Sequence, residues 1–123
     1  MNTFARTLVL ASLGLLSVSA PAFAHAHLKS ATPPVNGTVA TAPTELDLVF
    51  SEGLNLKFTG AKLAGADKKA VPTGDASLGT GGDTTLVVPV TAALDAGVYT
   101  VSWHALSTDG HKTTGTYKFT VKP

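Results

Sequence analysis

Short runs in which apolar and polar residues alternate constrain the fold of this sequence more than any other feature. The clearest runs are Glu45–Phe50, Val98–Trp103 and Thr116–Val121, and each places its apolar residues on one side of an extended chain. Beyond residue 24, no stretch offers apolar residues at the three-and-four spacing that an amphipathic helix requires. The pattern therefore predicts a chain that folds from strands.

Weaker strand candidates lie between these runs, and turn residues separate them. Further strands are expected at His27–Ala31, Leu56–Leu63, Lys69–Pro72 and Thr84–Pro89. Segments rich in Gly, Pro, Asn and Asp mark turns at 32–37, 65–67 and 79–83. About seven short strands without helices predict an all-β, immunoglobulin-like β-sandwich, with the sole tryptophan, Trp103, between its sheets.

The beginning of the sequence has the layout of a secretory signal peptide. Arg6 precedes the apolar run Leu8–Val18, and Ala22–Ala24 supplies small residues at both key positions of a cleavage site. The apolar run is too short for a comfortable membrane span, although an uncleaved anchor is the alternative. We expect residues 1–24 to be removed and residues 25–123 to form one exported, periplasmic domain that does not insert stably into the membrane.

The position of the cut decides which residue becomes the N-terminus. The distance from the apolar run favours cleavage after Ala24, which would expose His25, whereas Ala22 and Ala26 also satisfy the small-residue rule. Without Arg6, eight lysines remain against eight Asp and Glu residues, so the expected exported chain has no net charge. Neutral charge argues against nucleic acid or an anionic membrane as its main partner.

A histidine at a free N-terminus offers two nitrogen donors to one metal ion. If the chain is cut after Ala24, the α-amine and the imidazole Nδ1 of His25 can chelate an ion in a compact ring. The α-amine loses its proton readily because the pKa of such a group is about 8. These donors suit copper(II), which prefers square-planar or tetragonal sets of nitrogen and oxygen ligands.

Side chains from elsewhere in the sequence could complete such a site. In Asp109-Gly110-His111, the first and third side chains point to the same side of an extended chain and can converge on one ion. Glu52, just beyond the run Glu45–Phe50, is a further candidate ligand. Taken alone, the first motif is also an ordinary Asp-Gly turn beside a solvated histidine, and Glu52 is also an ordinary exposed carboxylate.

Six segments, spread in order over nearly the whole chain after residue 24, carry a combined resemblance. They read His-Ala-His-Leu-Lys-Ser, Thr-Pro-Pro, Leu-Val-Phe-Ser-Glu, Phe-Thr-Gly-Ala-Lys-Leu, Ala-Gly-Val-Tyr-Thr-Val-Ser-Trp and Ser-Thr-Asp-Gly-His. Together they resemble the CopC family of periplasmic copper-resistance proteins. The resemblance implies a Greek-key β-sandwich and one copper(II) ion held by His25, Asp109 and His111. Glu52 matches an acidic position that is a ligand in some members.

The sequence departs from part of that family in one respect. Some members carry a second site, for copper(I), in a methionine-rich loop that would fall within about residues 64–82, because copper(I) selects thioether and thiolate donors. This sequence has no Cys, and its single Met is Met1. We therefore predict a member that binds copper(II) and has no copper(I) site. The family's usual partner, an inner-membrane CopD-type copper transporter, is implied by the resemblance alone.

His27 is an alternative ligand. If His25 is the N-terminus, His27 is the third residue, and copper(II) can bind the amine, two deprotonated backbone amides and the third imidazole. That mode would pull the N-terminal segment away from strand pairing and leave His111 unused, so we expect His27 to be exposed or to lie just outside the ligands. His104 is interpreted as a structural or surface residue.

The sequence favours a binding protein for copper resistance and homeostasis over an enzyme. The alternative is a histidine-brace copper monooxygenase acting on a polysaccharide, since such enzymes also use an N-terminal histidine on an immunoglobulin-like sandwich. The small size of the chain argues against that alternative. So does its aromatic content, because its two tyrosines, Tyr99 and Tyr117, are both expected to face the core. A metal-free adhesion module is a third possibility.

Overall fold

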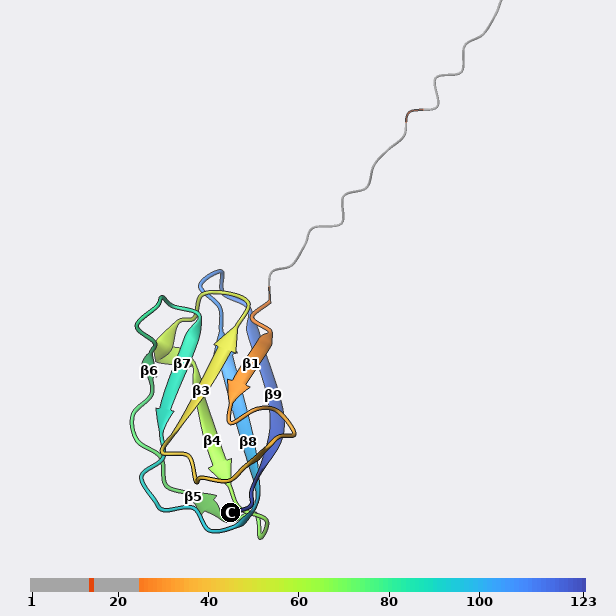
Figure 1. The fold of residues 1–123 in the computed structure, drawn as a ribbon. Helices are drawn as coiled ribbons and strands as arrows, with labels where there is room; N and C mark the ends of the chain where they lie inside the picture. The colour runs from red at the N-terminus through yellow and green to blue at the C-terminus, as the bar shows by residue number, and fades with distance from the viewer. Residues whose placement is uncertain (1–13, 15–24) are drawn as a thin grey trace, which may run out of the picture.

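The alternating runs of the sequence form strands in two β-sheets that pack face to face (Figure 1). The computed structural model describes Gly14 and residues 25–123. The 4-stranded sheet has the order β1 (Leu28–Thr32), β3 (Glu45–Phe50), β7 (Thr85–Pro89) and β6 (Ser77–Leu78). The 5-stranded sheet has the order β2 (Thr38–Val39), β9 (Lys112–Val121), β8 (Gly97–Leu106), β4 (Gly60–Ala64) and β5 (Ala70–Val71). This arrangement confirms the prediction of an all-β, immunoglobulin-like β-sandwich.

The core lies between the sheets and is made of the apolar residues that alternate along the strands. On β3, Leu46 and Leu48 are fully buried and Phe50 is 1% exposed, while the residues between them face outward. From the opposite sheet, Val101 of β8 and Phe119 of β9 are equally inaccessible. Burying one such side chain contributes about 1.5–3 kcal/mol, so this alternation fixes which face of each strand turns inward.

The expected strand Leu56–Leu63 is wrong in its first half. The 3₁₀ helix η1 (Leu56–Phe58) occupies that position, and β4 begins only at Gly60. The side chain of Asn55 caps the turn by accepting a 3.2 Å hydrogen bond from the backbone N–H of Lys57. The turn leaves Leu56 and Phe58 exposed, because the local cap replaces the ladder hydrogen bonds that a strand would need.

Two very short strands were not expected from the sequence. β2 and β6 each contain two residues, which is too short to show any alternation. β2 runs parallel to β9, whereas the other strand pairs are antiparallel. The other expected strands lie within a residue or a few residues of the observed ones.

Trp103 only partly fulfils its expected role between the sheets. Its ring meets Phe50 of the opposite sheet edge to face, with centroids 5.0 Å apart. The residue nevertheless remains half-buried. Its cross-strand partner is Gly115, where an added Cβ would lie only 2.4 Å from the Trp103 ring, so the ring leans across β9 toward the open side of the sandwich.

Three segments that are far apart in the sequence meet at one end of the sandwich. These are the segment entering β1, the end of β3 and the turn joining β8 to β9, all at the upper end in Figure 1. Within the described part of the chain, no helix is long and apolar enough to cross a membrane. Apart from Gly14, the predicted signal segment and its cleavage site lie outside the described residues.

Candidate metal centre

Ser51 fixes the segment that carries His25. Its hydroxyl donates a 3.0 Å hydrogen bond to the carbonyl of His25 and accepts a 2.9 Å bond from the backbone N–H of His27. Its own backbone N–H donates to the His27 carbonyl at 2.8 Å. These bonds extend the pairing of β1 with β3 beyond the strands, so the chain enters the fold at a defined place.

A second hydroxyl holds the same segment from the other sheet. Thr113, at the start of β9, donates a 2.9 Å hydrogen bond from its side chain to the carbonyl of Ala26. Ala26 is fully buried, which seats its small side chain in the end of the core. His25 is therefore held between the end of β3 and the start of β9, where it is half-buried.

The turn between β8 and β9 presents the other expected ligands. Ser107 is 2% exposed, and its backbone N–H donates to the carbonyl of His111 at 2.9 Å. The N–H of Gly110 donates to the Ser107 carbonyl at 2.9 Å, and Gly110 has φ +92°, a conformation that side chains rarely adopt. The turn is closed by its own hydrogen bonds, which gives Asp109 and His111 defined positions.

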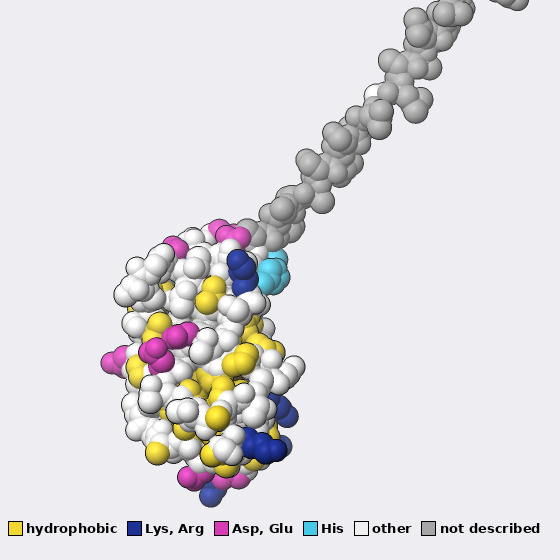
Figure 2. All heavy atoms as spheres, in the orientation of Figure 1, with side chains coloured by type: hydrophobic (Ala, Val, Ile, Leu, Met, Phe, Trp, Pro, Cys, Tyr) yellow, Lys and Arg dark blue, Asp and Glu magenta, His cyan; other side chains and the backbone are white. Residues whose placement is uncertain are grey.

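The structure brings the imidazoles of His25 and His111 together. Their ring centroids lie 5.0 Å apart with an interplanar angle of 82°. His27 is 6.2 Å from His25 by the same measure and is exposed. Figure 2 shows imidazoles, in cyan, gathered at one corner of the surface. The structure therefore brings two of the expected ligands, His25 and His111, next to each other.

Asp109 contacts His111 directly. Its carboxylate oxygen Oδ1 lies 3.1 Å from Nδ1 of His111 and also accepts a 3.3 Å hydrogen bond from the His111 backbone N–H. The Ser107 hydroxyl donates to the same oxygen. The Ser107 hydrogen bond and, after it, the bond with the His111 side chain hold the pKa of the Asp109 carboxyl below its ordinary value. Asp109 is therefore a carboxylate at neutral pH, which suits a cation nearby.

The described residues do not contain a group of three or more His, Cys, Asp or Glu side chains arranged to hold a metal ion. In addition, the backbone nitrogen of His25 is an amide in the uncut chain and not an amine. Nδ1 of His111 faces Asp109, and the Nδ1 atoms of His25 and His111 are both inaccessible to solvent. The centre is thus a set of neighbouring donors that a cut at residue 24 would alter.

The remaining candidates are placed less centrally. Glu52 follows Ser51 and is half-buried, but it forms no ion pair with any residue in the described range. The backbone amide of His27 is already bonded to Ser51. His104 is exposed on the 5-stranded sheet with its ring against Gly60, as expected for a surface residue. The positioning hydroxyls of Ser51, Ser107 and Thr113 were missed, because no local signal distinguishes them from other Ser and Thr residues.

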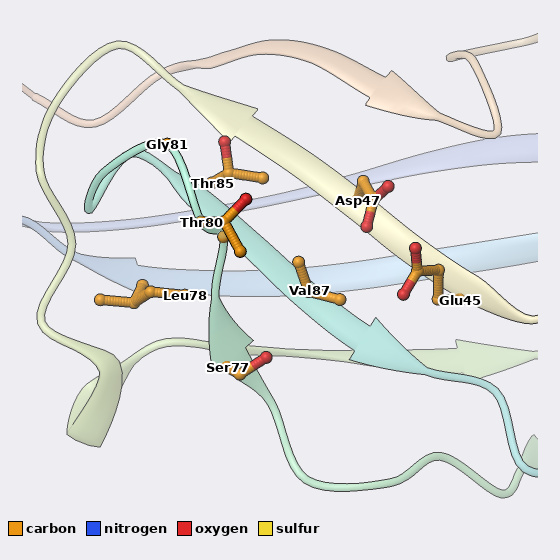
Figure 3. Close-up of a pocket in the computed structure, with 9 residues that line it drawn as sticks. Glu45, Asp47, Ser77, Leu78, Thr80, Gly81, Thr85 and Val87 are labelled. Carbon is orange, nitrogen blue, oxygen red and sulfur yellow. The ribbon is translucent and has the colours of Figure 1, made fainter.

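A large cavity lies away from this centre. It is a hollow of about 500 Å³ on the outer face of the 4-stranded sheet, with Glu45 and Asp47 of β3 at one end and Thr80 and Thr85 at the other (Figure 3). None of the expected ligands lines it. The candidate centre is therefore a surface cluster at the end of the sandwich and not a deep pocket.

Fold and site together define a small β-sandwich protein with a histidine cluster (His25, His27 and His111) at one end. Comparison with protein families gives the class its name: residues 28–122 match the CopC domain. The chain therefore belongs to the CopC family, which confirms the resemblance seen in the sequence.

Individual relatives agree over most of the chain. The chain is 41% identical over 124 residues to Protein YobA of Escherichia coli K12, covering 99% of this chain and 100% of that one. The crystal structure of CopC from Methylosinus trichosporium OB3b superposes with a TM-score of 0.74 at 30% identity, over 80% of this chain and 95% of that chain. PcoC of Escherichia coli, described as a methionine-rich copper resistance protein, gives 0.71 at 39% identity, over 80% and 100%.

Proposed function

We propose that residues 25–123, released by removal of residues 1–24, form a periplasmic protein that binds one copper(II) ion for copper resistance and homeostasis. The observation that carries the proposal is the 5.0 Å separation of the His25 and His111 rings. Cleavage after Ala24 would add a free α-amine beside those two imidazoles. Membership of the CopC family and the similarity to PcoC, a copper resistance protein, support the choice of metal.

The proposed ligands are the α-amine and imidazole of His25, the imidazole of His111 and a carboxylate. Asp109 is the first choice for the carboxylate, because it is ionised and lies 3.1 Å from His111. Asp109 could bind the ion itself or orient the His111 ring, since metal-binding histidines commonly donate their second N–H to a carboxylate. Glu52 is the other carboxylate candidate, because it adjoins Ser51 at the same end of the sandwich.

The alternative with His27 as a ligand is less well supported. That mode needs the backbone amide nitrogen of His27 as a donor to copper, yet this amide donates a 2.9 Å hydrogen bond to Ser51. Deprotonation of this amide would remove that bond, which is one of the bonds that hold the segment to Ser51. His27 is therefore proposed to stand next to the ligands without being one of them.

The oxidation state follows from the donor set. Nitrogen and carboxylate oxygen donors favour copper(II), whereas copper(I) prefers soft sulfur donors such as thioethers and thiolates. The exported chain would contain neither Cys nor Met, in contrast to the methionine-rich PcoC. We propose that the chain has no copper(I) site and that it stores, buffers or delivers copper(II). An inner-membrane CopD-type transporter is the partner that the family resemblance suggests.

A non-catalytic role fits the surface better than a polysaccharide monooxygenase. Tyr99 and Tyr117 are 8% and 5% exposed, so neither side chain is available to bind a polysaccharide. Among the exposed large hydrophobic side chains of the described residues, Phe58 is the one aromatic. Incubating the copper-loaded protein with a reductant and chitin or cellulose should release no oxidised oligosaccharides; their appearance would overturn this assignment.

The experiment that tests the proposal compares three chains that differ only at the N-terminus or at His27. The first begins at His25, the second retains Ala24, and the third begins at His25 and carries His27→Ala. Competition titration with copper(II) should show a loss on the order of 10–100-fold for the second chain and little change for the third. Equal affinities for the first two would contradict the amine ligand, and a large loss for the third would establish the His27 mode.

A further inference from the structure

The first half of β9 is an open strand edge. β2 pairs with β9 only at Thr38 with Thr120 and Val39 with Val121, close to the far end of the strand. Residues 112–116 therefore pair with β8 on one side and have no strand partner on the other within the described part of the chain. β9 correspondingly lies at the margin of the molecule in Figure 1.

Hydrogen bonds at both ends of β9 show which backbone groups face outward. Near its end, the Lys118 carbonyl accepts from the N–H of Asn36, and the Thr120 N–H donates to the carbonyl of Gly37. In an antiparallel pair, the backbone N–H and C=O groups of successive residues point alternately toward the partner strand and away from it. Even-numbered residues of β9 therefore direct their N–H and C=O away from β8.

The start of the ladder gives the same result. Leu106 stands opposite Lys112, and its own N–H and carbonyl turn away from β9 to Thr59 and Asn55. This pair therefore exchanges no ladder hydrogen bonds. The backbone groups of Lys112, Thr114 and Thr116 point into solvent, which is the condition for pairing with another extended chain.

A groove of about 430 Å³ runs beside this edge. Its apolar lining includes Leu28, Val35 and Trp103, and Val35 is 46% exposed. Gly115 lacks a side chain over the Trp103 ring, so the ring edge stays open to the groove. Hydrophobic side chains also reach the surface below the imidazoles in Figure 2. Alternate side chains of an added strand would thus contact the apolar residues that line the groove.

Charge indicates what kind of chain fits the edge. Lys112 is exposed at the start of the free stretch and Lys118 just beyond its end, and none of the described residues lining the groove is Asp or Glu. A second copy of this protein would bring the same lysines to the edge and be repelled. A partner with acidic residues alternating with apolar ones would pair with the lysines and fill the groove.

We propose that residues 112–116 and the adjoining groove bind an extended, acidic segment of a partner protein by strand addition. This goes beyond the proposed copper function and requires no metal. Because His27 also lines the groove, the bound segment would lie beside the histidine cluster. A partner docked in this way would reach the ion-binding end of the sandwich.

The test uses the exported chain and the peptide acetyl-Glu-Val-Glu-Val-Glu-amide, with acetyl-Lys-Val-Lys-Val-Lys-amide as its matched control. Amide hydrogen exchange, read residue by residue, should be fast at Thr114 and Thr116 in the free protein. The acidic peptide should slow both at least about tenfold while leaving Gly115, which faces β8, unchanged. The basic peptide should have no effect.

Two variants check the mechanism without disturbing the β8 ladder. Thr114→Pro removes one outward N–H and should abolish protection by the acidic peptide. The double variant Lys112→Glu, Lys118→Glu should reverse the preference and bind the basic peptide. No protection at peptide concentrations of about 1 mM, or equal protection by both peptides, would overturn the proposal. So would protection that rises with protein concentration alone, since the edge would then pair with a second copy.

Discussion

The side-chain hydroxyl of Thr113 donates a 2.9 Å hydrogen bond to the carbonyl of Ala26, which precedes it by 87 residues. This bond ties the start of β9 to the segment that carries His25. Ser51 ties the same segment to the end of β3. The separation between the His25 and His111 rings therefore depends on hydroxyl groups that are not themselves candidate ligands.

Removing the Thr113 hydroxyl should weaken both the fold and the site. Thr113→Val keeps the shape but leaves the carbonyl of the fully buried Ala26 without its bond, at a cost of about 1–3 kcal/mol in the free energy of unfolding. Urea unfolding measures that loss, and copper(II) competition should show weaker binding. Thr114→Val, at an exposed position of the same strand, should change neither stability nor affinity appreciably. Equal effects of the two variants would contradict this role.

Replacing individual histidines should show which of them contribute to copper(II) affinity and which do not. His25→Ala and His111→Ala should each lower copper(II) affinity on the order of 10–100-fold, because each removes a proposed ligand. His104→Ala should leave it unchanged, because that exposed ring packs against Gly60 on the 5-stranded sheet. Isothermal titration or spectral competition distinguishes the two groups. A strong effect of His104→Ala would mean that copper binds elsewhere.

Asp109 should titrate below its ordinary range. The Ser107 and His111 hydrogen bonds lower the pKa of its carboxyl, so they stabilise the fold above the ordinary pKa of 3.8, and this contribution is lost as pH falls through the lowered value. Ser107→Ala should raise the pKa of Asp109 toward 3.8, as read from its side-chain carboxyl carbon shift in the metal-free protein. An unchanged pKa in the variant would contradict the assigned cause.

Tyr117 should make the fold sensitive to strong base. Burial and, to a lesser extent, the negative charge of Asp47 raise its pKa to about 12. The folded state therefore holds the phenol proton more tightly than the unfolded state, in which tyrosine has its ordinary pKa of 10.0. The corresponding stability is complete below pH 10 and is lost as pH rises toward 12. Phenolate absorbance and unfolding measured across this range should agree.

Tyr117→Phe is the matched variant for that prediction. The Tyr117 hydroxyl is buried without a hydrogen-bond partner among the described residues, so removing it should leave stability at neutral pH unchanged or raise it. The variant should also lose the part of the base sensitivity that Tyr117 causes. Destabilisation of the variant by more than about 1 kcal/mol would mean that the hydroxyl makes a favourable interaction.

Much of the fold could be predicted because strand burial is a local, alternating property. Alternating runs indicated β3, β8 and the second half of β9, a weaker run indicated β7, and the structure has all four strands. The first half of the strand expected at Leu56–Leu63 is instead a 3₁₀ turn, because one cap, the Asn55 side chain, outweighs the strand propensity of the residues that follow it. β2 and β6 could not be predicted because pairing with β9 and β7, rather than any local pattern, creates them.

The sequence by itself determined the donor atoms of this protein: four histidines, eight carboxylates and, after residue 1, no sulfur. It also determined which face of each long strand is buried, since alternation requires no knowledge of the partner. Only the tertiary structure decided that His25 and His111 lie side by side, that the His27 amide is bonded to Ser51, and that β9 keeps an open edge. Those results depend on the register between strands far apart in the sequence, which no local pattern of residues encodes.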